Sequence, residues 1–132
     1  MKRITSVGLV AVFVTLFAAH AAWAANNPTV GWDTGQPVAA AGQVSGSGTY
    51  TLPNPNNAGW QPNGVVVLSA FPTGGGQTFT QGGKVPANGT WAKVTIMNLP
   101  TGQYTVFATI QFKNTNGDTT NIATPTAIVN VP

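Results

Sequence analysis

Most enzyme and metal sites are built from carboxylate, imidazole, thiol or guanidinium side chains, and this chain of 132 residues contains few of them. Beyond residue 24 there is no Glu, Arg, His or Cys, and the charged side chains are Asp33, Asp118, Lys84, Lys93 and Lys113. This composition excludes a Cys nucleophile, a His general base, a zinc site and a carboxylate-rich calcium loop. It also argues against nucleic acid as a partner, because three lysines neutralise few phosphates.

The two aspartates offer little chemistry of their own. Glycoside hydrolysis usually needs two carboxyl groups that face each other across the scissile bond. Asp118 follows the turn sequence Asn116-Gly117, and Asp33 precedes Thr34-Gly35. An aspartate in such a place commonly forms hydrogen bonds within its own turn. Serines are present, but no His or Glu accompanies them to activate a hydroxyl. The sequence therefore predicts a non-enzyme with no cofactor and no catalytic, cofactor-binding or metal-binding residues.

The aromatic side chains are the remaining candidates for recognition. Trp60 stands in a loop rich in Pro, Asn and Gly, and the strand alternation predicts that Trp91, Phe107 and Met97 face outward. Exposed rings flanked by Asn, Gln and Thr suit the faces of sugars, and an outward apolar stripe can equally mark a protein interface. Trp60, Trp91 and Phe107 are therefore the candidate ligand or partner contacts. The alternative is structural: Trp60 anchors its loop and Trp91 covers a sheet edge, because large aromatic side chains are usually well buried.

The first 24 residues predict a cleavable export signal. Met1-Lys2-Arg3 is a positively charged start, residues 7–19 form an apolar core, and Ala22-Trp23-Ala24 places small residues where a signal peptidase reads them. We expect cleavage after Ala24 and secretion to the periplasm, the cell surface or the medium. An uncleaved anchor over residues 4–25 is the alternative, weakened by an Ala-rich second half. Residues 25–132 are enough for one domain.

Short β-like segments separated by Gly, Pro and Asn make up this domain. In residues 104–113 every second side chain is apolar, which predicts a strand with one buried face, and the apolar run at 65–71 suits a central strand. Glycines within 38–52 predict a bulge, and Pro125 directs the last strand, 120–131, to a sheet edge or a bulge. About seven such segments without helical periodicity predict an all-β, antiparallel β-sandwich, with a small barrel as the alternative.

One segment resembles a known family. Leu99-Pro100-Thr101-Gly102-Gln103-Tyr104 is similar to the connection between the fifth and sixth strands of immunoglobulin-like and fibronectin type III domains. In those domains a Tyr near the start of the later strand bonds back to upstream backbone, an arrangement called the tyrosine corner. Leu99 and Tyr104 are the matching residues. The resemblance implies a bacterial secreted immunoglobulin-like or fibronectin type III-like sandwich, without the cysteine pair of antibody domains.

These features lead us to expect a non-enzymatic secreted module with a structural, adhesive or assembly role at the cell surface or in the matrix. The alternatives are a small carbohydrate-binding domain that uses exposed aromatic rings, and a secreted accessory subunit or inhibitor. Candidate partners are a cell-surface protein, a second copy of the chain or a polysaccharide, with no membrane contact once the leader is removed. Three lysines against two aspartates leave residues 25–132 nearly neutral, which favours association.

Overall fold

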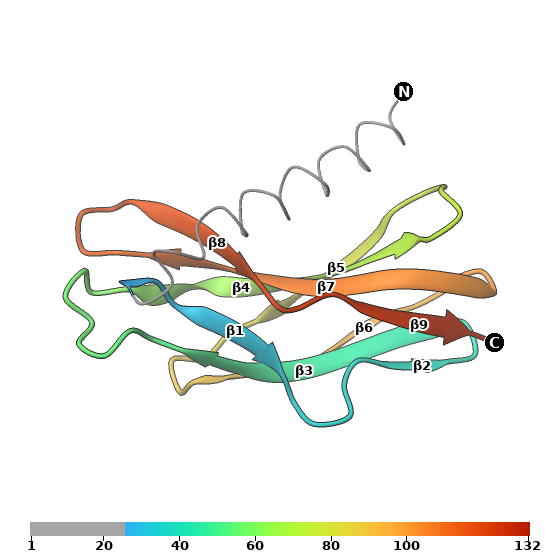
Figure 1. The fold of residues 1–132 in the computed structure, drawn as a ribbon, viewed down its shortest axis with the longest axis horizontal. Coiled ribbons are helices and arrows are strands. Elements are labelled where there is room, and N and C mark those ends of the chain that lie inside the picture. The colour runs from blue at the N-terminus through green and yellow to red at the C-terminus, as the bar shows by residue number, and fades with distance from the viewer. Residues whose placement is uncertain (1–25) are drawn as a thin grey trace.

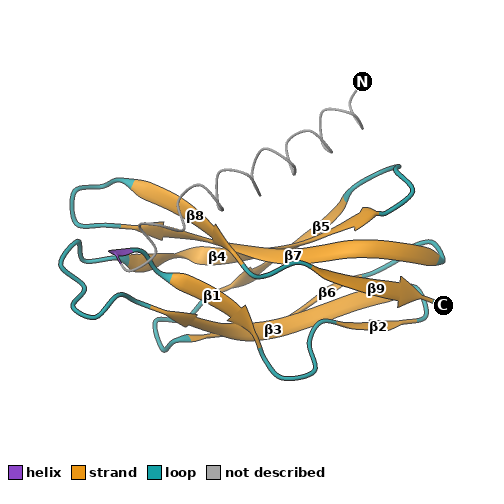
Figure 2. Ribbon diagram, viewed as in Figure 1, coloured by secondary structure: helices purple, strands orange, loops and turns teal. Residues whose placement is uncertain are grey.

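The computed structural model describes residues 26–132, so the predicted leader, residues 1–24, lies outside them. Figure 2 shows strands joined by loops, with a short helical turn where this part begins. The strands are β1 (Thr29–Trp32), β2 (Val38–Ala40), β3 (Gln43–Thr51), β4 (Gln61–Pro72), β5 (Phe79–Lys84), β6 (Thr90–Ile96), β7 (Gly102–Lys113), β8 (Thr119–Ala123) and β9 (Ala127–Val131). Between residues 26 and 132, no helix has the length and apolar character needed to cross a membrane.

The strands form two separate antiparallel sheets. In the first, β3 lies in the centre, with β6 on one side and both β1 and β2 on the other. In the second, the order is β5, β4, β7, and then β8 and β9 one after the other along the same edge of β7. We call these the three-position sheet and the four-position sheet. The nine strands thus occupy seven positions, because β1 and β2 share one edge of the first sheet and β8 and β9 share one edge of the second.

Figure 1 shows the two sheets as layers that run roughly along the same axis, an arrangement compatible with a β-sandwich. A single apolar cluster joins their inner faces, and its fully buried members come from both sheets, among them Val44 from β3, Leu68 from β4 and Ile110 from β7. No ladder links the two sheets within residues 26–132, so the barrel alternative does not describe this part of the chain. The alternation in residues 104–113 predicts the buried face of β7 correctly.

The glycines predict a bulge within residues 38–52, but the structure places the additional residue on the partner strand β6, opposite Gly46 and Gly48. Between the pairs Gly46–Val94 and Gly48–Trp91, β6 advances three residues while β3 advances two. The additional residue reverses the alternation of β6, so Trp91 faces the core together with Val94. The prediction that Trp91 faces outward is therefore wrong, because strict period two ignores this irregularity.

Pro125 separates β8 from β9, where the sequence predicts one strand over residues 120–131. Between the pair Thr109–Ala123 and the pair Val106–Ala127, β7 spans three residues and the edge segment spans four. The edge segment therefore holds one additional residue. The predicted bulge and the predicted edge position are thus both confirmed. Thr124 repairs the ladder at this point, because its Oγ1 accepts a hydrogen bond from the buried Ala108 N–H at 3.0 Å.

Replacing Thr124 with valine is expected to lower the free energy of unfolding by about 1–3 kcal/mol, because the Ala108 N–H is then buried without an acceptor. Valine keeps the shape and β preference of threonine, so the loss isolates the hydroxyl. Urea unfolding followed by circular dichroism measures the change. Thr126→Val, at an exposed position two residues away, is the control and should change stability little. Equal midpoints for the two variants would contradict the role given to Thr124.

Candidate functional surface

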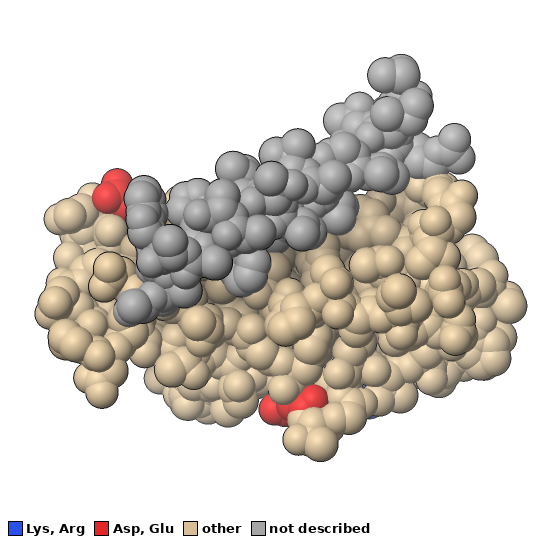
Figure 3. All heavy atoms as spheres, in the orientation of Figure 1, with Lys and Arg blue, Asp and Glu red and all other residues tan. Residues whose placement is uncertain are grey.

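The two aspartates lie in separate turns and do not face each other (Figure 3). Asp33 accepts a hydrogen bond from the Ser47 hydroxyl through Oδ2 at 2.8 Å, and its carbonyl oxygen accepts one from the Gln36 N–H at 3.0 Å. The backbone of Asp118 exchanges hydrogen bonds with Asn114 at 2.9 Å. Figure 3 shows the acidic side chains as two separate places on the surface. No three His, Cys, Asp or Glu side chains gather into a metal-binding group within residues 26–132.

Trp60 lies against the protein. Its side chain is only 8 % exposed, and its Nε1 donates a hydrogen bond to the Asn26 carbonyl oxygen at 3.2 Å. The Asn56 side chain bonds both the N–H and the carbonyl oxygen of Trp60 at 3.0 Å, which closes the loop before β4. The expectation of an exposed Trp60 ring is wrong, and the alternative of a loop anchor describes its place. Stacking against this ring would require the loop to open.

Trp91 is deeper still, with 1 % of its side chain exposed. Its ring lies 5.7 Å from that of Trp32 at an angle of 55°, and it packs directly over Gly48. Trp32 in turn covers Gly46 and donates a hydrogen bond from Nε1 to the Pro125 carbonyl oxygen at 2.9 Å. This last contact ties β1 to the crossing between β8 and β9 in the opposite sheet. The two indoles are therefore part of the core.

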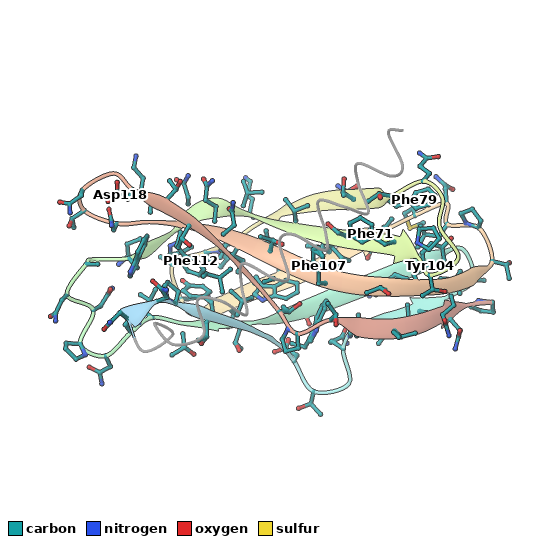
Figure 4. All side chains as sticks on the ribbon, turned by 45° about the horizontal axis from the view of Figure 1, so that its top comes forward. Phe71, Phe79, Tyr104, Phe107, Phe112 and Asp118 are labelled. Atoms are coloured by element: carbon teal, nitrogen blue, oxygen red, sulfur yellow. The ribbon has the colours of Figure 1, made fainter. Side chains whose placement is uncertain are left out.

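Phe107 has the outward strand phase that the alternation predicts, but only 6 % of its side chain is exposed. Its ring lies 5.6 Å from that of Phe71, a half-buried side chain on β4, and Figure 4 shows the two rings on neighbouring strands. The prediction of an exposed Phe107 is therefore wrong, although its face is right. Met97 does face solvent, as predicted.

The outer face of the four-position sheet combines apolar and polar side chains. Along β4 it carries Val65, Val67, Ser69 and Phe71, and Val65 is 49 % exposed. Beside them β7 carries Thr105, Phe107, Thr109 and Gln111, and β9 adds Ile128 next to Thr105. We call this set the outer face. Lysines lie only at its ends, at Lys84 and Lys113, so most of it is uncharged.

A groove of about 380 Å³ lies at the end of the same sheet, between the loop after β4 and the connection from β6 to β7. No charged side chain lines it. The rings of Phe79 and Tyr104 form its apolar wall, with centroids 6.3 Å apart (Figure 4). Thr73 and Gln103 at its rim bond each other, Oγ1 to Oε1 at 3.1 Å. The polar groups of the groove thus bond within the protein, and they do not converge on a ligand.

Tyr104 makes the backbone contact that the sequence predicts for a tyrosine corner. Its hydroxyl donates a hydrogen bond to the Pro100 carbonyl oxygen at 2.6 Å, while its ring and the side chain of Leu99 are buried. The Thr73 N–H donates to the Gln103 carbonyl oxygen at 3.0 Å just beside it. Tyr104 therefore holds the crossing from one sheet to the other and is not available to a ligand.

Replacing Tyr104 with phenylalanine is expected to lower the free energy of unfolding at neutral pH by about 1 kcal/mol, the usual net value of one such hydrogen bond. Burial raises the pKa of Tyr104 above its ordinary value of 10.0, so the unfolded chain loses this proton at a lower pH than the folded one. The stability that the neutral hydroxyl contributes is therefore complete below about pH 10 and declines above it. Urea unfolding at pH 7 and at pH 10.5 should show a smaller alkaline loss in Tyr104→Phe than in the wild type, and equal losses would contradict this account.

Comparison with models of known protein families, with curated proteins and with solved structures finds no match to this chain. Its function is accordingly argued from its own residues.

Proposed function

We propose that this chain is a secreted, non-enzymatic module of immunoglobulin-like or fibronectin type III-like form that binds or assembles at the cell surface or in the matrix. The sheet order supports the form, with one sheet of three positions and one of four, and so does the tyrosine corner at Tyr104. The leader sequence supports secretion. The function itself is a matter of surface chemistry, because such sandwiches serve many unrelated purposes.

The outer face carries the functional part of the proposal. An exposed apolar surface bordered by polar side chains is typical of a site where another macromolecule binds. Here Val65 and the ring of Phe71 lie among the hydroxyl and amide groups of Thr105, Thr109 and Gln111. Few charges surround them, so binding need not strip water from ionic groups.

A sedimentation experiment tests the proposal. The purified protein is mixed with host envelope or with insoluble polysaccharide and centrifuged, with and without competing soluble sugar. We expect co-sedimentation with envelope that soluble sugar leaves unchanged. Loss of sedimentation in sugar would instead favour the carbohydrate-binding alternative, centred on Phe71 and the neighbouring hydroxyl groups. A protein that never sediments, but co-purifies with a partner from the host medium, would favour the accessory subunit or inhibitor.

A matched pair of variants locates the surface. Val65→Glu places a carboxylate on the outer face opposite Lys84, where an opposite charge on the neighbouring strand is tolerated. Met97→Glu adds the same charge at a side chain that is 57 % exposed and lies outside this sheet. We expect Val65→Glu to weaken envelope binding by about tenfold, which corresponds to about 1.4 kcal/mol, and Met97→Glu to bind as the wild type does. Equal binding by both variants would remove the outer face from the proposal.

A further inference from the structure

The strand β9 (Ala127–Val131) lies at the edge of the four-position sheet and is bonded to only one neighbour. Its ladder joins it to β7, from Gly102–Val131 to Val106–Ala127. Figure 1 shows it running to the C-terminal end, between β7 and β2 in that view. No backbone hydrogen bond joins β9 to any other strand among residues 26–132. In this part of the chain, one side of its backbone is therefore without a hydrogen-bonded partner strand, and β2 of the other sheet lies nearby without bonding to it.

The alternation of β7 shows which backbone groups of β9 point outward. The N–H and carbonyl oxygen of Ala108 are both bonded to Thr124, whereas the carbonyl oxygen of Gln103 is bonded to Thr73 on the β4 side. Even-numbered residues of β7 therefore direct their backbone groups toward β9, because the direction alternates along a strand. Val129 pairs with Tyr104 and bonds to it, so Ile128 and Asn130 direct their N–H and carbonyl groups away from the sheet.

The side chains of β9 do nothing to prevent another strand from adding here. Natural proteins protect sheet edges with charged residues, prolines, bulges or short strands. Three other edge strands have such protection: Lys84 on β5, Lys93 on β6, and Pro37 before the three residues of β2. The sequence Ala127-Ile128-Val129-Asn130-Val131 contains neither charge nor proline, and Ile128 is 65 % exposed, the most exposed of the large apolar side chains described. The bulge at Pro125 ends just before this segment.

We propose that β9 pairs, antiparallel and edge to edge, with β9 of a second copy of this chain. The proposal gives a contact surface to the assembly role proposed above and rests on that role. A two-fold axis at Val129 would place Ile128 of each copy opposite Asn130 of the other copy. The outward N–H and carbonyl groups of the two strands would then bond each other. The two four-position sheets then become one continuous sheet. The nearly neutral charge of residues 26–132, with three lysines and two aspartates, offers little repulsion between the copies.

A second copy fits this edge better than an unrelated strand, because the outward backbone groups of β9 are complementary to those of another β9 in antiparallel orientation. Both partners offer the same two outward-facing residues at the same spacing, and this satisfies a two-fold contact. The contact is small, since five residues a side bury less than a stable dimer usually does. The dimer is therefore expected to be weak and to depend on concentration.

Analytical ultracentrifugation of the purified protein, from micromolar to about 1 mM, tests the proposal. We expect a monomer at low concentration that passes reversibly to a dimer. Ile128→Glu should weaken the dimer by about tenfold or more, because it places two carboxylates at the contact. Its net charge is lower than that of the wild type, so general repulsion cannot explain a loss. Val65→Glu carries the same charge on the outer face away from the edge and should dimerise as the wild type does.

A second pair of variants isolates the backbone. Asn130→Pro removes an N–H that points to solvent in the monomer, a place where edge strands tolerate proline. Asn130→Ala keeps the N–H and loses only the amide, whose contact with Gln103 is long at 3.4 Å. We expect Asn130→Pro to remain monomeric with a thermal midpoint close to that of Asn130→Ala, and Asn130→Ala to dimerise.

Three results would overturn the edge contact. They are a wild type that is monomeric at 1 mM, a dimer that survives in both Ile128→Glu and Asn130→Pro, and a dimer lost in Val65→Glu alone. The envelope sedimentation described above keeps the two proposals apart. A wild type that binds envelope but does not dimerise removes the edge contact only, whereas a wild type that dimerises without binding envelope removes the proposed surface role.

Discussion

A single methyl group at Gly48 is expected to prevent this protein from folding stably. Gly48 lies on the inner side of β3 between Trp32 on β1 and Trp91 on β6. A Cβ at Gly48 would overlap the carbonyl oxygen of Gly31 and stand 2.6 Å from Nε1 of Trp91. Neither neighbour can yield cheaply, because one is strand backbone and the other is a fully buried ring. Gly48→Ala should therefore cost about 3 kcal/mol or more in free energy of unfolding, a large share of the stability of a small domain.

Gly31 offers a matched control on the adjacent strand. A Cβ built there has no atom within 4 Å, so Gly31→Ala should change the free energy of unfolding by less than about 0.5 kcal/mol. Urea unfolding followed by tryptophan fluorescence gives both values, and the midpoint measures stability as long as the slope is unchanged. If Gly48→Ala matched Gly31→Ala, the close packing of indole on glycine described here would be wrong.

Truncating Trp91 to alanine is expected to cost about 3–5 kcal/mol, the usual range for removing a buried aromatic side chain. The ring is almost completely buried against Trp32 and Gly48, and the rigid sheet around it cannot collapse into the space. Its Nε1 is buried without a hydrogen-bond partner. Trp91→Phe should therefore cost much less, about 1–2 kcal/mol, because it keeps an aromatic ring and removes a polar group that gains nothing in the fold.

The same two variants decide between a core residue and a binding residue. If Trp91 is a core residue, the loss of stability should follow the side-chain volume removed. The urea midpoint of Trp91→Ala should then be far lower than that of Trp91→Phe. A ring used for binding would behave differently, because alanine would then abolish sedimentation with envelope or polysaccharide while the midpoint stayed close to that of the wild type. Met97→Ala, at an exposed position beyond the end of β6, is a control for both measurements.

Several features of the fold can be predicted from the sequence because they depend on neighbours along the chain. The alternation in residues 104–113 places Tyr104 and Phe112 on the buried side of β7 correctly. Pro125 cannot donate to a ladder, and it does lie at an edge, within a bulge. The backbones of Asp33 and Asp118 bond within their own turns, to Gln36 and Asn114, whereas the Asp33 carboxylate bonds to Ser47 on β3.

The proposed binding surface could not be predicted in the same way. Trp60 and Trp91 were the natural candidates, since a Trp in a Gly-rich loop and a Trp on a polar strand phase both predict exposure. One additional residue in β6 turns Trp91 inward, and hydrogen bonds to Asn56 and Asn26 turn Trp60 inward. Asn26 is distant from Trp60 in sequence, and the additional residue in β6 is visible only from its pairing with β3. Gly46 and Gly48 could have indicated that large rings pack above them.

The sequence by itself determined that residues 26–132 are all-β, where most of their strands lie, which face of β7 is buried, and that few charged side chains are present in this part. These follow from side-chain period and composition, which act locally. Only the tertiary structure decided which rings fill the core, which edge is left without protection, and that Ile128 and Asn130 direct their backbone groups outward. Such properties depend on strand pairing between distant segments, where a shift of one residue moves side chains from one face of a sheet to the other.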